Sequence, residues 1–325
     1  MDVLFSGLTS YLENSLAPST LQTYRSGARR YIAFCSYQRV TPFPSTELVL
    51  CLFVVHLARS NLSFKTIRVY LFGVQFHSLL NGFPVKISSM QYLYYTLRGI
   101  RRTQGNSLTR PPRSPITVSH LWSMLAFLAS SHFTPQDKSL WHCATVLAFF
   151  GLLRVSEFTC SGVFDPTLHL APADISFNSA FSIMYVNIKG SKTDPFKSGC
   201  VVRLAAIPGH ELCPISAMRR FLGFRGHSQG PLFTLSSGDY LTRRLVDYFL
   251  HLSLPGIPNI GTHSFRIGGA SAALAAGASD ALIRVMGRWS SDCYNRYIRV
   301  SDSQISRFQL DLSSAQVTRV WNSDM

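Results

Sequence analysis

The sequence predicts a mainly α-helical protein with one small β-sheet, an α+β class, arranged as two folded parts. Apolar residues recur at helical spacing through roughly the first hundred residues. A proline-rich segment without periodicity follows, and a single later stretch alternates with the two-residue period of β-strands. The 325 residues are long for one compact domain and sufficient for two.

The first part is predicted to be a helical bundle over residues 1–103. Apolar residues at helical spacing in its first helix are Tyr24, Ala28, Tyr31, Ile32 and Cys35. Arg25 and Arg29 lie on another face of that helix, so we expect basic outer surfaces. The helices are expected at 19–37, 46–60, 63–80 and 88–103.

Residues 104–116 are predicted to link the two parts. The run QGNSLTRPPRSP contains Pro111, Pro112 and Pro115, which make a linker semi-stiff. The alternative is a long surface loop within one domain.

The second part, 117–325, is predicted to be mostly helical around one small sheet. Residues 183–188 alternate as a strand, a second strand follows at 200–206, and GSKTDPFKSG between them is typical of a hairpin turn. The helices are expected at 117–131, 137–152, 214–224, 238–251, 263–276, 279–286 and 291–300.

The composition indicates an intracellular protein that meets an anionic partner. Lys and Arg number 31 against 16 Asp and Glu, a formal charge of +15, which favours nucleic acid, although a ribosome-associated or merely basic protein is an alternative. The seven cysteines form no C-x-x-C pair, so we expect core thiols rather than disulfides or a structural zinc site. Residues 1–10 lack a signal-peptide pattern, and no apolar run is long enough to cross a membrane.

Several residues of the second part suit the chemistry of phosphodiester cleavage. That reaction needs a nucleophile, cationic donors for the phosphate oxygens and an acid for the leaving oxygen. Arg154 follows an apolar run, and Glu157 is placed to hold it by a bidentate pair; an exposed helix end is the alternative. Lys192 lies on the hairpin turn and is a candidate acid, with Lys189 and Lys197 as competitors.

The remaining candidates lie near the C-terminus. His263 and Arg266 form an H-x-x-R pair that would share one helix face near a positive dipole end, although this pattern is common by chance. Trp289 carries an N–H donor, with a core anchor as the alternative. Tyr294 and Tyr297 are candidate nucleophiles, and a phenol needs neighbouring cations to ionise near neutral pH.

In this order the residues resemble the catalytic set of the tyrosine recombinase (phage integrase) family. GLLRVSEF is similar to the first arginine box of the family, SKTD to its lysine hairpin, and THSFR, GRWSS and YIR to its second box. The resemblance covers about residues 117–300, and 18–35 more loosely resembles the core-binding, DNA-binding domain of the family. GRWSSD and YIR look most like recombinases of eukaryotic DIRS-type and Crypton mobile elements.

The resemblance implies a role for each residue. Arg154 and Arg266 would clamp the scissile phosphate, Lys192 would act as general acid, and His263 would manage the proton of the nucleophile. Trp289 would donate to a phosphate oxygen. Tyr297 would form a 3′-phosphotyrosine without metal or cofactor; the spacing from Trp289 is one residue shorter than usual, so Tyr294 stays open.

The resemblance also implies partners and a location. Double-stranded DNA would be clamped between the two parts, with Arg25, Arg29, Lys65, Arg68 and residues 98–113 neutralising phosphates. The tail after Tyr297, with Ile305, Phe308, Leu310 and Leu312, would dock on a neighbouring protomer in a tetrameric synapse, in the nucleus. The alternatives are a domesticated DNA-binding protein, a type IB topoisomerase-like enzyme and a basic helical scaffold.

Overall fold

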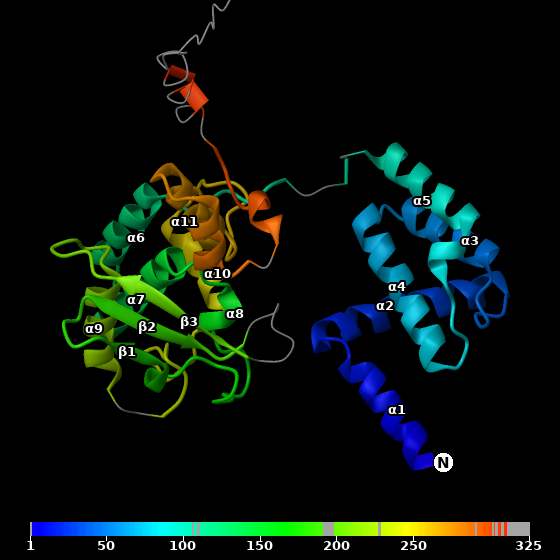
Figure 1. The fold of residues 1–325 in the computed structure, drawn as a ribbon, viewed down its shortest axis with the longest axis horizontal. Helices are drawn as coiled ribbons and strands as arrows, with labels where there is room; N and C mark the ends of the chain where they lie inside the picture. The colour runs from blue at the N-terminus through cyan, green and yellow to red at the C-terminus, as the bar shows by residue number, and fades with distance from the viewer. Residues whose placement is uncertain are drawn as a thin grey trace, which may run out of the picture. The chain divides into compact units, whose positions relative to one another are not determined.

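A computed structural model of the chain divides into two compact units, Met1–Pro111 and Pro112–Met325 (Figure 1). The structure describes residues 2–105, 107–108, 111–190, 198–226, 229–289, 291–300, 302, 305–306 and 309–310.

The first unit is helical throughout its described part. The four predicted helices are present, and a further helix that was not predicted precedes them. Two of the predicted helices begin at a hydroxyl cap: Thr46 accepts a hydrogen bond from the Val49 N–H, and Ser63 accepts one from Thr66. The helices are α1 (Asp2–Asn14), α2 (Pro18–Gln38), α3 (Glu47–Arg59), α4 (Phe64–Leu80) and α5 (Gln91–Gln104), with a 3₁₀ turn at Ile87–Ser89.

Helices α2 and α4 pack backbone to backbone through two glycines. A Cβ on Gly27 would lie 2.7 Å from the Tyr70 Cα, and one on Gly73 would lie 2.4 Å from the Tyr24 carbonyl oxygen. Tyr31 of α2 is fully buried with its ring beside those of Phe43 and Phe53, whereas Ile32, which was predicted on the apolar face, is 36% exposed. The core of this unit is formed by Tyr31, Phe34, Cys35, Leu50, Phe53, Val54, Leu57, Ile67, Leu71, Val74 and Leu93.

Two polar side chains cap helix ends across this bundle. The Glu47 carboxylate of α3 accepts a hydrogen bond from the Leu93 N–H at the start of α5, at 3.1 Å. The Gln104 amide, at the end of α5, accepts from the Phe64 N–H at 2.8 Å and donates to the Leu62 carbonyl at 2.9 Å. The bonds from the Leu93 and Phe64 N–H groups satisfy donors that helix starts leave open.

The second unit is mainly helical around a three-stranded antiparallel sheet, which confirms the predicted fold class (Figure 1). Its order is β1-β2-β3, and Met184, Val186 and Ile188 point into the core. Strand β1 has three residues, too short for its alternation to be read in the sequence. The strands are β1 (Ile175–Phe177), β2 (Ile183–Ile188) and β3 (Cys200–Ala205).

Helix α7 lies at the centre of the second unit and is buried along most of its length. It packs against α6, α9 and α11. The helices of this unit are α6 (Val118–Ser130), α7 (Pro135–Phe150), α8 (Val155–Phe158), α9 (Pro214–Arg225), α10 (Arg243–Ser253), α11 (Ser264–Ala275) and α12 (Asp280–Gly287). The helix predicted at 291–300 is only a 3₁₀ turn, Asp292–Arg296.

The end of the predicted linker is attached to the second unit. Ile116 is fully buried, and its N–H donates to the Ser264 carbonyl at 3.0 Å. Arg113 donates to the Ile260 carbonyl at 2.7 Å. At the other end, Gln104 belongs to α5. The domain limits drawn from the sequence remain predictions.

The cysteines are all free thiols, and five of the seven are buried. This agrees with their prediction as core residues. None of the helices described is long and apolar enough to cross a membrane.

Candidate active site

Arg154 and Glu157 meet at a sharp turn between α7 and α8. Leu152 in this turn has a positive φ of 46°, so the chain reverses and Arg154 becomes the N-cap of α8. The Glu157 carboxylate accepts from the Arg154 guanidinium at 2.8 Å and from the Arg154 backbone N–H at 2.9 Å. The predicted ion pair between these two residues is present, but it is not bidentate, because only one guanidinium nitrogen of Arg154 contacts the carboxylate. Arg154 also starts a short helix after a turn instead of ending the apolar one.

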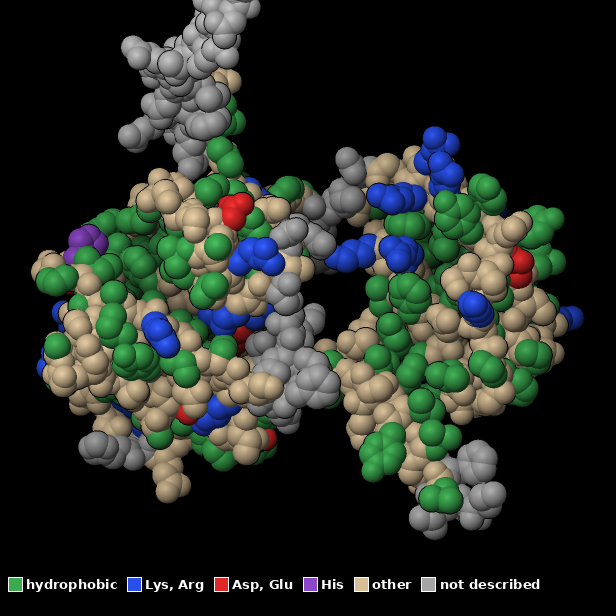
Figure 2. Space-filling model, viewed as in Figure 1, with side chains coloured by type: hydrophobic (Ala, Val, Ile, Leu, Met, Phe, Trp, Pro, Cys, Tyr) green, Lys and Arg blue, Asp and Glu red, His purple; other side chains and the backbone are tan. Residues whose placement is uncertain are grey.

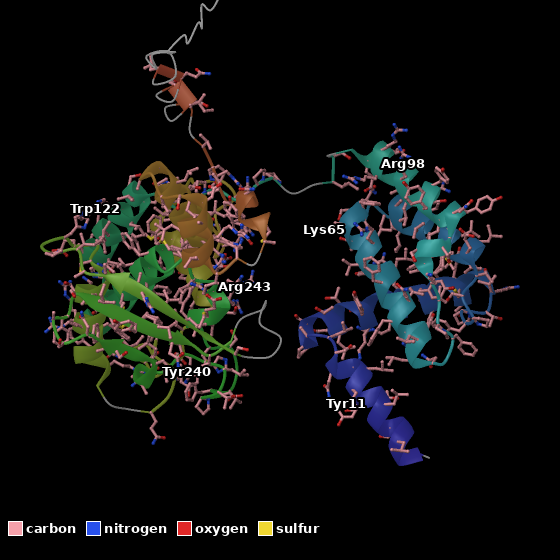
Figure 3. All side chains as sticks on the ribbon, viewed as in Figure 1. Tyr11, Lys65, Arg98, Trp122, Tyr240 and Arg243 are labelled. Carbon is pink, nitrogen blue, oxygen red and sulfur yellow. The ribbon has the colours of Figure 1, made fainter. Side chains whose placement is uncertain are left out.

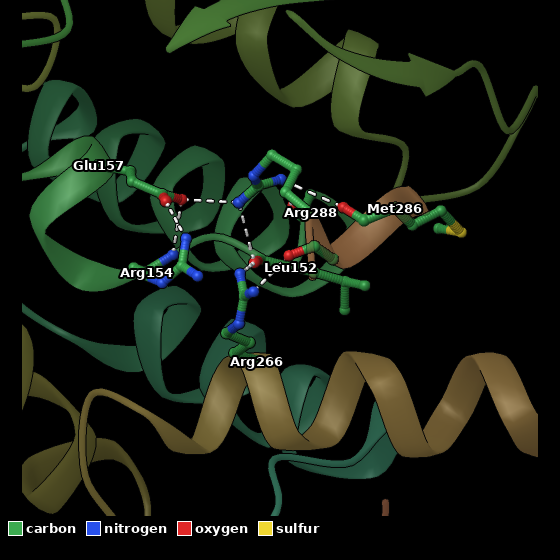
Figure 4. A network of polar contacts seen from close by, with 8 residues as sticks. Leu152, Arg154, Glu157, Arg266, Met286 and Arg288 are labelled. Carbon is green, nitrogen blue, oxygen red and sulfur yellow. Dashed lines mark hydrogen bonds and ion pairs between the residues drawn. The ribbon is translucent and has the colours of Figure 1, made fainter. Parts of the chain in front are cut away.

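A third residue, Arg288, completes this ionic cluster (Figure 4). Its guanidinium donates to the second Glu157 oxygen at 2.7 Å. The Glu157 side chain has no exposed surface, so its charge is balanced by the two arginines rather than by water. Arg288 was not among the residues predicted from the sequence.

Arg266 lies on α11 and is fully buried. Its guanidinium donates to the carbonyl oxygens of Leu152 and Gly287. Burial, together with the positive charges of Arg154 and Arg288, lowers the pKa of Arg266 to about 9. Arg266 therefore stays protonated at neutral pH, and main-chain carbonyls fix its orientation.

Two glycines let α11 approach its neighbours closely enough to bury Arg266. A Cβ on Gly268 would lie 1.8 Å from the Ile116 carbonyl oxygen, and one on Gly269 would lie 2.4 Å from the Phe149 carbonyl oxygen. The small-residue helix that follows H-x-x-R in the sequence is thus a packing requirement of the site.

His263 is the N-cap of α11 and keeps an exposed face. Desolvation by the surrounding atoms lowers the pKa of His263 to about 4, and neighbouring positive charges add to this effect; they belong to Arg266, Arg154, Arg113 and Arg243. The imidazole is therefore neutral at pH 7 when no anion is bound beside it.

The Tyr297 ring lies beside the rings of His263 and Trp289 and near the Arg266 guanidinium. Its ring centroid is 4.9 Å from that of His263 and 5.1 Å from that of Trp289, and the Arg266 Cζ is 5.8 Å from the Tyr297 ring. Tyr297 is partly exposed, whereas Tyr294 is 4% exposed within a small apolar cluster. The geometry therefore favours Tyr297 over Tyr294 as the accessible phenol.

Trp289 packs in a small apolar cluster, as the core-anchor alternative describes, and its donation to a phosphate oxygen remains a prediction. Its ring is 7% exposed and packs against Arg266, whose Cζ lies 4.3 Å from the ring centroid. A Cβ on Gly287 would lie 1.7 Å from the Trp289 ring, so a glycine is required there. The indole N–H is buried and has no hydrogen-bond partner.

Unpaired donors are concentrated in this cluster. Five buried side-chain polar atoms lack a partner in the described part of the chain, and three of them are the Nε of Arg266, the Nε of Arg288 and the Nε1 of Trp289. Buried donors are normally satisfied, so three unpartnered donors in one cluster call for an acceptor such as an ordered water, an ion or a bound ligand.

A hydroxyl holds the chain that carries Tyr297. The Ser271 Oγ, on α11, accepts a hydrogen bond from the Arg299 N–H at 2.9 Å and lies 3.3 Å from the Tyr297 carbonyl oxygen. Sequence reasoning missed the roles of Ser271 and Arg288, although Arg288 lies in the GRWSS string, because the partners of both side chains lie far away in the sequence.

The predicted general acid Lys192 and its competitor Lys197 lie outside the described residues. The third lysine, Lys189, forms an ion pair with Asp174 at 2.7 Å and donates to the Pro166 carbonyl at 2.7 Å. Lys189 therefore anchors the base of the hairpin, which leaves Lys192 and Lys197 as candidates. Among the described residues, no cluster of three or more His, Cys, Asp or Glu is arranged to hold a metal ion.

This fold, mainly helical with a three-stranded sheet, is that of tyrosine recombinase catalytic domains. The Tn1549 transposon integrase in complex with transposon right end DNA superposes with a TM-score of 0.60 at 14% identity, over 96% of this chain and 98% of that chain. The XerH site-specific recombinase bound to its difH substrate superposes with a TM-score of 0.57 at 17% identity, over 89% of this chain and 78% of that one.

In sequence, the chain is similar to an integrase/recombinase xerD homolog of Selenomonas ruminantium, with 23% identity over 228 residues. The match covers 68% of this chain and spans 61% of the length of that relative. No family model matches the sequence.

Proposed function

We propose that the protein is a site-specific DNA recombinase that cleaves and rejoins strands through a 3′-phosphotyrosine on Tyr297. The observation that carries the proposal is the placement of a partly exposed phenol against a neutral imidazole and a buried guanidinium. The similarity to the xerD homolog supports the same reaction class.

In the proposed reaction the Tyr297 oxygen attacks the scissile phosphorus and the bond from phosphorus to the 5′-oxygen breaks. His263 is neutral at pH 7 without ligand, and the phosphate anion bound beside it would offset the arginine charges that lower its pKa, so that it can accept the phenolic proton. Arg154 and Arg266 stabilise the charge on the non-bridging oxygens. Lys192 donates a proton to the leaving 5′-oxygen. The new phosphotyrosine ester conserves the bond energy, and attack by a 5′-hydroxyl reverses the step.

The first unit is proposed to bind the duplex through α4 and α5. Met1–Pro111 contains 12 Lys and Arg against 3 Asp and Glu. Figure 2 shows basic side chains gathered on this unit, and Figure 3 shows Lys65 on α4 and Arg98 on α5. Arg68 and Arg101 flank a groove of about 480 Å³ between these helices. Arg25 is less available than predicted, because it pairs with Glu13 at 2.7 Å.

The finer assignments are also proposals. A role in integrating or excising a eukaryotic mobile element is supported by the sequence resemblance to such recombinases and by the fold shared with a transposon integrase. Strand exchange would take place in a homotetrameric synapse in the nucleus. Ile305 and Leu310 are exposed, as a docking tail requires, whereas Phe308 and Leu312 lie outside the described residues.

The test is formation of a covalent protein–DNA adduct in EDTA on a nicked suicide substrate carrying an element junction. Wild type, Tyr297→Phe and Tyr294→Phe are compared on a denaturing gel. We expect an adduct that disappears only with Tyr297→Phe. If the adduct disappears only with Tyr294→Phe, the nucleophile is Tyr294 and not Tyr297. Tight, salt-sensitive binding without an adduct on any junction would favour a non-catalytic DNA-binding protein.

The role of Lys192 is tested with a substrate whose leaving 5′-oxygen is replaced by sulfur. A thiolate leaves without protonation, so the sulfur substrate should restore cleavage to Lys192→Ala. Lys197→Ala is the matched control on the same hairpin. If the sulfur substrate restores cleavage only to Lys197→Ala, the general acid is Lys197 and not Lys192.

A further inference from the structure

Arg288 occupies a backbone conformation that favours glycine. It is the C-cap of α12, with φ 55° and ψ 47° in the left-handed region. Non-glycine residues adopt this region at a cost in stability, so an arginine here needs compensating contacts. The side chain is 15% exposed, so these contacts are formed inside the protein.

The Arg288 guanidinium is held at both of its terminal nitrogens (Figure 4). One nitrogen donates to the carbonyls of Gly151 at 3.0 Å and Met286 at 3.2 Å. The other donates to the Leu152 carbonyl at 3.2 Å and to Glu157 at 2.7 Å. These contacts tie the end of α12 to the turn that precedes Arg154.

Two of these acceptors are shared with the arginines proposed to clamp the phosphate. Glu157 binds Arg154 through the same carboxylate that binds Arg288. The Leu152 carbonyl accepts from both Arg266 and Arg288. Without Arg288, Glu157 would be held by Arg154 alone, and the Leu152 carbonyl would accept from Arg266 alone.

We propose that Arg288 is a positioning residue of the active site, which holds Glu157 and the Leu152 carbonyl so that Arg154 and Arg266 meet the scissile phosphate in a fixed geometry. This inference rests on the proposed cleavage function. It requires Arg288 to act through Glu157 rather than on DNA directly.

The first experiment measures whether the contacts of Arg288 outweigh its backbone strain. Arg39 is the matched control, because it is the C-cap of α2 with φ 55° and ψ 39° and is exposed. Arg39→Gly removes the cost of the left-handed backbone conformation without losing buried contacts, so it should raise Tm. Arg288→Gly relieves the same strain but loses the contacts, so its Tm should fall below wild type. An equal rise in both variants would overturn the inference.

The second experiment measures single-turnover adduct formation and DNA affinity for Arg288→Gly, Arg288→Lys, Glu157→Gln and the Arg288→Gly/Glu157→Gln double variant. We expect Arg288→Gly to slow adduct formation roughly 10- to 100-fold while Kd stays within about twofold of wild type. Lysine should restore part of the rate, because one ammonium reaches Glu157 but not the carbonyls as well.

The double variant decides how Arg288 acts. If it acts through Glu157, the double variant should be no slower than the slower single variant, within about threefold. Losses that multiply, or a Kd that rises with the loss of rate, would overturn the inference in favour of a direct phosphate contact. An active wild type with an unaffected Arg288→Gly also overturns it. A wild type without any adduct overturns the cleavage function itself.

Discussion

Replacing Glu157 with alanine should destabilise the second unit by about 3 kcal/mol, because it removes the only carboxylate among three guanidinium groups in the described cluster. The carboxylate accepts three hydrogen bonds, two from Arg154 and one from Arg288. Breaking a buried ion pair by removing one partner costs roughly 3–5 kcal/mol. The arginine side chains are 16% and 15% exposed, so some rehydration places the value at the low end.

The assay is urea unfolding followed by tryptophan fluorescence. All four tryptophans lie in Pro112–Met325, so the signal reports on the second unit alone. Asp137→Ala is the matched control, because this buried carboxylate accepts only neutral donors, the N–H and hydroxyl of Ser236. Ser236 is exposed and rehydrates, so the control should cost about 1–2 kcal/mol. Equal losses in the two variants would refute the charge argument.

Three further predictions concern other parts of the molecule. Because the folded-state pKa of His263 is about 4 and its ordinary value is 6.5, the unfolded chain binds the proton first. Stability should therefore fall as pH drops from about 6.5 towards 4, and urea midpoints at pH 7 and 4.5 should show a smaller fall in His263→Gln. Gly268→Ala should abolish soluble expression of the folded chain, since its Cβ would lie 1.8 Å from the Ile116 carbonyl oxygen. The control Gly99→Ala lies in a helix with open space around it, so it should raise Tm. Arg68→Ala should weaken DNA binding and reduce the slope of log Kd against log salt by about 1, measured by fluorescence anisotropy; an unchanged slope would remove Arg68 from the DNA surface.

Local spacing was sufficient for much of the site. Arg154 and Glu157 are three residues apart, and a short helix brings such residues together whatever the rest of the fold does. The helix predicted at 263–276 is likewise present as α11, and Gly268 and Gly269 are where it approaches its neighbours. In both cases the contact depends on a few consecutive residues.

Contacts that join distant segments were not predictable in this way. Arg288 reaches Glu157 across 131 positions of sequence, and no pattern near either residue indicates the pairing. The choice between Tyr294 and Tyr297 also depended on tertiary structure. Helical spacing gave them one face, but the segment forms a 3₁₀ turn that buries Tyr294 against Trp289 and leaves Tyr297 beside His263.

The charge balance of the cluster links its stability to its proposed chemistry. Arg154, Arg266 and Arg288 carry three positive charges against the one negative charge of Glu157, and carbonyl dipoles offset only part of the difference. Burial lowers the pKa values of Arg266 and His263, and the same positive field lowers them further. A site that holds such an excess without a ligand is less stable than its packing allows. A phosphodiester anion bound there would relieve the repulsion and supply an acceptor for the unpaired Nε of Arg266. The repulsion that lowers the stability of the folded chain would then strengthen binding of the negative charge that grows on phosphorus during cleavage.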